Sequence, residues 1–324
     1  MAAPLLEPWL ALPRIESTVR LIDSGADLDG LFDMPDGSTL TVASVDMATG
    51  DLHTARWRGT GDVGFYPAST IKWITAAMAV AWMDQHDMSP ETVIQLGDER
   101  PATMRELILS SLMMSDNDAF NTLQESVGFA ETYAAMKNWG VQHSMIRRHF
   151  TRPHWNHSRP IRVTHPDGQT AEIAERPAVD IPLNLDPRPA PLGNPESNYF
   201  TSDDFVVCGA ATLMGPTRDT TSFPLLTQGL SWANQNYVRE GLTQLTGELD
   251  ARPAFATLAK PGWWPPDGAN SELAYIYDAT QDRHYFLATY VQGTNDEARV
   301  EMNKAARTVF GAIHRGELDL ASKA

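Results

Sequence analysis

Residues 65–72 read Phe-Tyr-Pro-Ala-Ser-Thr-Ile-Lys, and a largely apolar run follows them over 73–82. The run predicts a buried helix that begins close to Ser69. Residues three apart on a helix share one face, so the Lys72 amine should lie one turn from the Ser69 hydroxyl. A lysine amine can take a proton from a serine hydroxyl once burial or a nearby cation has lowered its pKa. The spacing therefore indicates a nucleophilic serine with a lysine base.

Two further motifs follow in the chain. Ser115-Asp-Asn117 comes after a predicted helix that begins at Thr103, where Glu106 completes a capping box. Lys260-Pro-Gly262 comes at the end of a predicted strand. Taken alone, Ser115-Asp-Asn117 could simply join two helices, and Lys260 could simply be the solvated end of a strand. Together they indicate one site, in which two lysines near one serine lower each other's pKa and leave at least one amine neutral near pH 7.

Apolar periodicity and turn residues predict the remaining elements. Strands are expected over 38–45, 52–58, 254–260, 272–278 and 284–292, and helices over 15–24, 103–114, 119–127, 132–139, 201–215, 222–245 (with interruptions) and 295–315. Strands near both ends and helices between them predict the α+β class, with one antiparallel sheet flanked by helices (an α/β/α sandwich) and an all-α lobe beside it.

The same pattern predicts a single domain over residues 1–324. An α/β lobe should comprise about 1–68 and 216–324, with a helical lobe of about 69–215 inserted into it. Residues 150–198 are rich in proline and are expected to form a long irregular excursion.

Composition excludes several classes of partner. The chain has 25 Lys and Arg against 41 Asp and Glu, a net charge of −16, which argues against nucleic acid. Its single cysteine, Cys208, excludes an intrachain disulfide. No apolar run is long enough to predict a membrane span. The first residues lack signal-peptide features, so a periplasmic or secreted location would require a signal already removed, and a cytoplasmic location is the alternative.

Residues 141–166 contain five arginines, five histidines and no acidic residue. Zinc binding through His149, His154 and His157 is one interpretation, but no cysteine or carboxylate lies close by in the sequence. We favour the interpretation that the arginines pair with the acidic remainder of the protein, or face a substrate carboxylate. We therefore expect neither a metal nor another cofactor.

Taken together, Ser69-x-x-Lys72, Ser115-Asp-Asn117 and Lys260-x-Gly262 resemble the motifs of class A β-lactamases and penicillin-binding proteins. Asn121, four residues after Asn117, fits the class A branch. The likeness covers roughly residues 38–145 and 200–315 and implies a β-lactamase/transpeptidase-like fold.

The resemblance implies catalytic roles for four side chains. Ser69 would be the acylated nucleophile, and Lys72 its base or proton relay. Ser115 would carry the proton to the leaving atom, and Lys260 would supply positive charge beside it.

The resemblance also implies binding and structural roles. Asn117, Gly262 and Trp263 would bind the substrate, Asn117 through a substrate amide. Backbone N–H groups of Ser69 and Trp263 would form the oxyanion hole. Asp116 and Asn121 would hold the loops that aim the reacting groups.

Two features depart from the family pattern. Pro261 replaces the threonine of the third motif and so removes a hydroxyl and a backbone donor, and Trp263 and Trp264 make the rim bulky. No residue matches the glutamate that activates the deacylating water in class A enzymes; Glu196 is the nearest candidate. Without that base, the acyl-enzyme would hydrolyse slowly, or a lysine would serve in both steps.

The sequence thus predicts a serine hydrolase that forms an acyl-enzyme with a small-molecule or peptide substrate containing an amide or ester. β-Lactamase-like hydrolysis with weak or unusual β-lactam activity is the preferred form. A penicillin-binding DD-peptidase and a small-ester esterase are the alternatives, and a serine glutaminase-like amidase is a more distant one. A different class is a β-lactam or peptidoglycan binding or sensor protein that has lost turnover.

Overall fold

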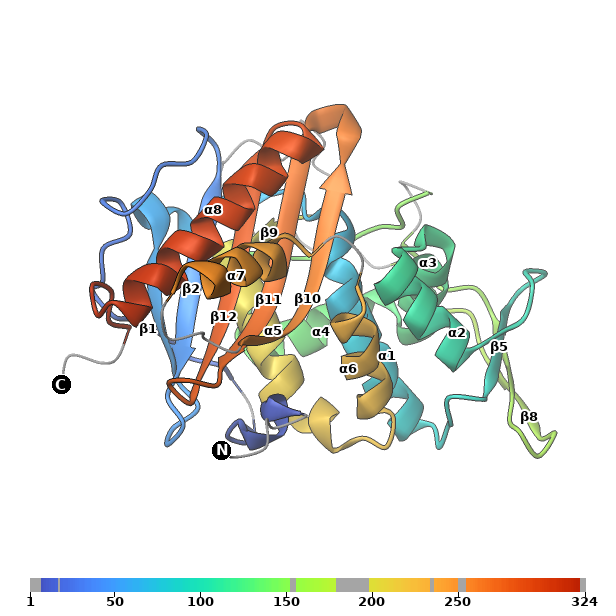
Figure 1. Ribbon diagram of the computed structural model, residues 1–324. Coiled ribbons are helices and arrows are strands. Elements are labelled where there is room, and N and C mark those ends of the chain that lie inside the picture. Colours follow the sequence, from blue (N-terminus) through green and yellow to red (C-terminus); the bar gives the residue numbers. More distant parts are fainter. Residues whose placement is uncertain are drawn as a thin grey trace.

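The fold centres on a six-stranded sheet (Figure 1). The computed structural model describes residues 7–16, 18–151, 156–178, 198–233, 236–249 and 255–320. The order of strands across the sheet is β1 (Leu21–Asp23), β3 (Leu52–Arg56), β2 (Thr39–Val45), β12 (Arg283–Gln292), β11 (Ala269–Asp278) and β10 (Phe255–Trp264). All neighbouring strands pair antiparallel except β1 and β3, which are parallel. Strands from both ends of the chain therefore meet in one sheet.

Helices cover both faces of this sheet (Figure 1). On one face lie α7 (Tyr237–Glu248) and α8 (Asn295–His314); on the other lie α1 (Lys72–Gln85), α5 (Ser202–Met214) and α6 (Phe223–Ser231). Successive residues of a strand point to opposite faces, so β11 sends Leu273 into the α1 side of the core and Ala274 into the α8 side. The expected α+β class, an antiparallel sheet flanked by helices, is confirmed.

The lobe expected over about 69–215 begins with α1. It contains α2 (Met104–Leu109), which continues as a π-helical turn over Ser110–Met114, then α3 (Asn117–Val127) and α4 (Phe129–Trp139). The lobe is not all-α, because it also carries a four-stranded sheet in the order β6 (Ala102–Thr103), β5 (Val93–Leu96), β7 (Ile161–Thr164) and β8 (Thr170–Ile173).

Strands β7 and β8 form a hairpin inside the segment that was expected to be irregular throughout. Ile161 and Val163 are buried and alternate with Arg162, and this period-2 pattern is typical of a strand with one covered face. Residues 179–197 of that segment lie outside the described residues, and so does the candidate base Glu196.

A helix expected over 15–24 is wrong. Residues 21–23 form β1 instead, with Leu21 in register with Leu52. The edge of the sheet offers backbone partners that a short, proline-flanked helix lacks, so tertiary pairing overrides the weak local pattern. The remaining short elements are a strand pair, β4 (Gly64–Phe65) and β9 (Phe200–Thr201), and 3-10 turns at Pro8–Ala11, Trp57–Asp62, Ala68–Ile71, Pro216–Asp219 and Pro265–Asp267.

Within the described part of the chain, no helix is both long and apolar enough to cross a membrane.

Candidate active site

Ser69 lies in the 3-10 turn Ala68–Ile71, which leads directly into α1. Hydrogen bonds of hydroxyl groups connect this turn to β11. Thr70 Oγ1 lies 2.8 Å from Ser271 Oγ, and Ser271 Oγ donates to the Pro67 carbonyl at 2.7 Å. Ala68 has a φ of 45°, a conformation that non-glycine residues seldom adopt. The Ser69 turn is therefore held against the sheet, and Ser69 faces a cavity beside β10.

Lys72 is the first residue of α1, and its side chain is fully buried. Its Nζ donates to Asn117 Oδ1 at 2.7 Å and to the Ser115 carbonyl oxygen, and it lies 3.4 Å from Ser115 Oγ. Burial, together with the nearby charge of Lys260, lowers the pKa of Lys72 to about 6. The amine is therefore mainly neutral at pH 7 and can accept a proton.

Ser115 ends the π-helical turn in a left-handed conformation, with φ 58° and ψ 33°. This conformation is strained for a serine. The turn directs the carbonyl and hydroxyl groups of Ser115 toward two lysines. The next residue, Asp116, caps α3 by accepting a hydrogen bond from the Ala119 backbone at 2.8 Å. The cap fixes where α3 begins and hence where Asn117 lies.

Lys260 approaches Ser115 from β10, the edge strand of the sheet. Its Nζ donates to Ser115 Oγ at 3.0 Å and to the Pro261 carbonyl at 2.9 Å. Burial lowers the pKa of Lys260 to about 7, although the buried carboxyl of Glu272 acts in the opposite direction. Ser115 Oγ thus lies between two amines whose pKa values fall near neutrality.

A cavity of about 420 Å³ lies at these groups. Its lining residues are Ser69, Met113, Met114, Ser115, Asn117, Tyr237, Lys260, Pro261, Gly262, Trp263, Trp264 and Pro265. The rim is apolar and open, with Met114 70% and Trp263 43% exposed. Lys260 is the only cationic side chain among these lining residues, and no carboxylate is among them.

Pro261 is tolerated because none of the described strands pairs with the outer side of β10. It stands opposite Glu272 of β11, and an edge strand accepts a residue without a backbone N–H. The same outer edge faces the Ser69 turn. A Cβ atom on Gly262 would lie 2.6 Å from the Ser69 nitrogen, so only glycine permits this approach.

Asn121 forms hydrogen bonds to Phe150 and Thr151, two residues that the sequence pattern did not connect with the site. Its side-chain oxygen accepts from the Phe150 backbone at 3.1 Å, and its side-chain nitrogen donates to Thr151 Oγ1 at 2.7 Å. These bonds bring the Phe150 ring over the amine of Lys72, with 5.2 Å between Nζ and the ring centre. Phe150 and Thr151 carry no local signal, because their partner lies 29 and 30 residues earlier, in α3, and α4 stands between them.

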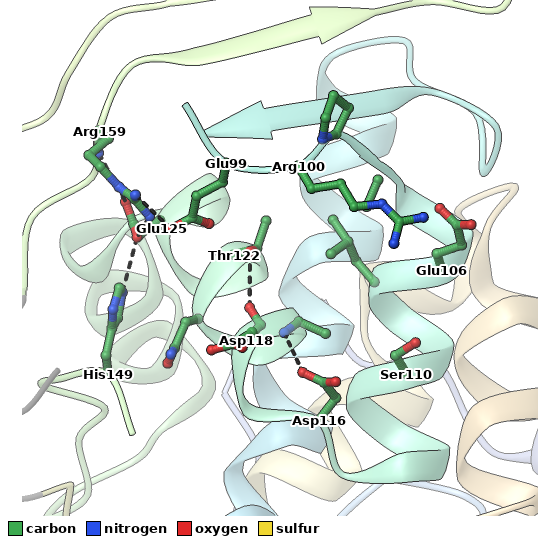
Figure 2. A pocket seen from close by; sticks show the side chains of 15 residues that line it. Glu99, Arg100, Glu106, Ser110, Asp116, Asp118, Thr122, Glu125, His149 and Arg159 are labelled. Atoms are coloured by element: carbon green, nitrogen blue, oxygen red, sulfur yellow. Dashed lines mark hydrogen bonds and ion pairs between the residues drawn. The ribbon is translucent and has the colours of Figure 1, made fainter. Parts of the chain in front are cut away.

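A second cavity, of about 610 Å³, is lined in part by Asp116 and by residues of α3, and it shares no lining residue with the first (Figure 2). Figure 2 shows Arg159 directed at Glu125, with His149 on the same carboxylate. Arg159 also binds Glu99 at 2.7 Å, as expected for arginines that pair with the acidic remainder of the protein. Among the described residues, no three His, Cys, Asp or Glu side chains converge as metal ligands, and His154 lies outside them.

Comparison with known proteins gives one family match. A family model described as the β-lactamase enzyme family matches residues 34–313. No curated protein matches significantly.

Solved structures of similar fold include the class A β-lactamase of the last common ancestor of Gram-negative bacteria. It is 22% identical, with a TM-score of 0.60, and the match covers 86% of this chain and 95% of that one. An ancestral class A β-lactamase is 21% identical, also with a TM-score of 0.60, over 85% of this chain and 95% of the other. At these identities the likeness concerns the fold.

Proposed function

Since the chain belongs to the β-lactamase enzyme family, we propose that it is a serine hydrolase that forms an acyl-enzyme at Ser69. One observation carries this proposal: Ser115 Oγ lies 3.4 Å from Lys72 Nζ and 3.0 Å from Lys260 Nζ, in the cavity that Ser69 lines. The contacts form a proton path beside the nucleophile. Residues 1–324 then act as one catalytic domain, which is supported by a sheet built from both ends of the chain.

In the first step, the neutral amine of Lys72 takes the proton from Ser69 Oγ while that oxygen bonds to the substrate carbonyl carbon. The developing oxyanion accepts hydrogen bonds from the backbone N–H groups of Ser69 and Trp263. The close approach of Gly262 to Ser69 supports this assignment. The bond from the carbonyl carbon to the leaving nitrogen or oxygen then breaks, that atom takes its proton from Ser115 Oγ, and a protonated lysine returns one to Ser115.

In the second step, a water oxygen bonds to the acyl carbon, the bond from that carbon to Ser69 Oγ breaks, and a proton returns to Oγ. No carboxylate is among the described lining residues of this cavity, which supports a neutral lysine as the group that takes the proton from water. Asn117 accepts from Lys72 through its oxygen, so its side-chain nitrogen can donate to a substrate carbonyl.

The substrate is a small molecule or peptide with an amide or ester bond, and β-lactams are one such class. The rim favours a second candidate, the hydrolysis of neutral esters or amides with an aromatic group. Trp263 and Met114 offer exposed apolar contact, Pro261 lacks the hydroxyl of the family motif, and Lys260 is largely neutral above pH 7. Such a site attracts a substrate carboxylate weakly.

The test is intact-protein mass spectrometry of wild type and Ser69→Ala mixed with benzylpenicillin, a chromogenic cephalosporin or p-nitrophenyl phenylacetate. An acyl adduct or turnover that is lost in Ser69→Ala supports the acyl-enzyme. Fast colour from the cephalosporin without a lasting adduct indicates a working β-lactamase, and a lasting adduct indicates a binding or sensor protein. Turnover of the ester alone favours the second candidate. Turnover that persists in Ser69→Ala would reject Ser69 as the nucleophile.

A further inference from the structure

The amine of Lys72 is enclosed by two segments of different character. The oxygen atoms that accept its hydrogen bonds belong to Ser115 and Asn117. From a separate segment, Phe150 brings its ring to the same amine, 5.2 Å from Nζ to the ring centre. A hydrocarbon ring offers water no hydrogen bond, so the space that it fills beside the base is closed to water.

The position of this ring is fixed by contacts on both sides of residue 150. Asn121 accepts from the Phe150 backbone at 3.1 Å and donates to Thr151 at 2.7 Å. The preceding residue, His149, is fully buried, with its Nε2 3.5 Å from the carboxylate of Glu125 (Figure 2). The Phe150 ring also packs against Phe120, with 4.6 Å between ring centres. This segment is therefore built to hold an aromatic ring at the base.

We propose that Phe150 is a positioning residue that keeps water away from the Lys72 amine, so that acylation of Ser69 is fast and hydrolysis of the resulting ester is slow. The inference rests on the acyl-enzyme proposed above. In acylation the proton comes from Ser69 Oγ, and no water is needed. In hydrolysis the proton comes from water, which must reach the same amine before its oxygen can bond to the acyl carbon and release Ser69 Oγ.

The Phe150 ring has two opposite effects on the pKa of Lys72, and different substitutions of Phe150 separate them. Exclusion of water disfavours the charged amine, whereas the face of an aromatic ring attracts it. Within the described part of the chain, the other charged groups that act on Lys72 are Lys260 on β10 and Asp116 before α3, and substitution of Phe150 changes neither. Leucine at 150 keeps the exclusion and removes the ring face, whereas alanine removes both.

The first experiment needs no substrate. The chain has five lysines, so the 13Cε signals of labelled lysine can be assigned with single Lys→Arg variants and followed through a pH titration. We expect Phe150→Ala to raise the pKa of Lys72 by at least about one unit, and Phe150→Leu to leave it unchanged or lower it. Equal Lys72 pKa values in Phe150→Ala and Phe150→Leu would reject exclusion of water by the ring, because the two variants differ in that effect alone.

The second experiment measures formation and loss of the Ser69 adduct by mass spectrometry of samples quenched at successive times. The substrate is benzylpenicillin or p-nitrophenyl phenylacetate. We expect adduct loss in Phe150→Ala to be at least about tenfold faster than in wild type, with Phe150→Leu close to wild type. Thr151→Val leaves the ring but removes one bond to Asn121, and should accelerate adduct loss less. Equal adduct loss in all variants would overturn the proposal. Turnover in wild type without any adduct would also overturn the proposed slow hydrolysis. Absence of both adduct and turnover would instead count against the acyl-enzyme, while the titration still decides the role of Phe150.

Discussion

A Cβ atom on Gly262 would lie 2.6 Å from the backbone nitrogen of Ser69, closer than side chains normally approach. Two elements meet at this point, the edge strand β10 and the turn that begins α1. Their contact places the backbone after Gly262 beside the nucleophile. The geometry of the proposed oxyanion hole therefore depends on the absence of one side chain.

We expect Gly262→Ala to lower the rate of Ser69 acylation about 10²- to 10³-fold, the usual effect of losing one oxyanion donor. The added methyl group has only backbone and the Thr70 hydroxyl to displace, so we also expect a loss of about 1–3 kcal/mol in the free energy of unfolding. Adduct formation and urea unfolding measure the two effects. Gly247→Ala is the matched control, because a Cβ there meets nothing within 4 Å. Wild-type acylation in Gly262→Ala would contradict the prediction.

The rate of acylation should pass through a maximum between about pH 6 and pH 7. Lys72, with a pKa of about 6, must be neutral to accept the Ser69 proton, so the rate falls as pH drops below that value. Lys260, with a pKa of about 7, supplies positive charge beside Ser115 only while protonated, so the rate falls again above that value. Because the two lysines interact, the profile reports apparent values of the pair. In Lys260→Met, the fall on the alkaline side should disappear.

Glu272→Gln should make the free energy of unfolding less dependent on pH. Burial raises the pKa of Glu272 to about 8, although its carboxylate accepts from the Tyr237 and Val238 backbones. The folded protein therefore holds a proton between about pH 4.5 and pH 8 that the unfolded chain releases, and stability falls as pH rises through that window.

The glutamine variant lacks this proton and should be more stable than wild type by about 2–4 kcal/mol above pH 8, with little difference near pH 4.5. Urea unfolding at several pH values measures the difference. The exposed Glu172→Gln serves as control and should match wild type throughout. A constant difference between Glu272→Gln and wild type at all pH values would show that the carboxyl does not change its protonation.

Trp263→Ala should weaken the binding of aromatic substrates. Loss of one exposed aromatic contact is expected to raise KM for p-nitrophenyl phenylacetate about tenfold, with kcat within about twofold, because the backbone N–H of residue 263 stays in place. Trp232→Ala is the control, since that side chain is 65% exposed and does not line the cavity. An equal rise in KM for p-nitrophenyl acetate, which lacks only the phenyl ring of the acyl group, would argue against recognition of that ring.

Much of the architecture could be predicted from local patterns. The strands around 39–45 and 283–292 follow from alternation, and the capping box of Thr103 and Glu106 marks the start of α2 as expected. The exceptions are elements that depend on distant partners. β1 needs β3, and the small sheet needs β5 to pair with β7, which lies far along the chain.

The sequence by itself determined the spacing of Ser69 and Lys72, because residues three apart in a continuous chain share one turn. It also determined the residue types of the other two motifs. Only the tertiary structure decided how these groups meet, since Lys260 reaches Ser115 across 145 residues and Phe150 reaches Lys72 from an irregular segment. Local periodicity records which face of an element is buried, but it carries no information about what packs there. The contacts that set the pKa of Lys72 and the access of water arise from that packing.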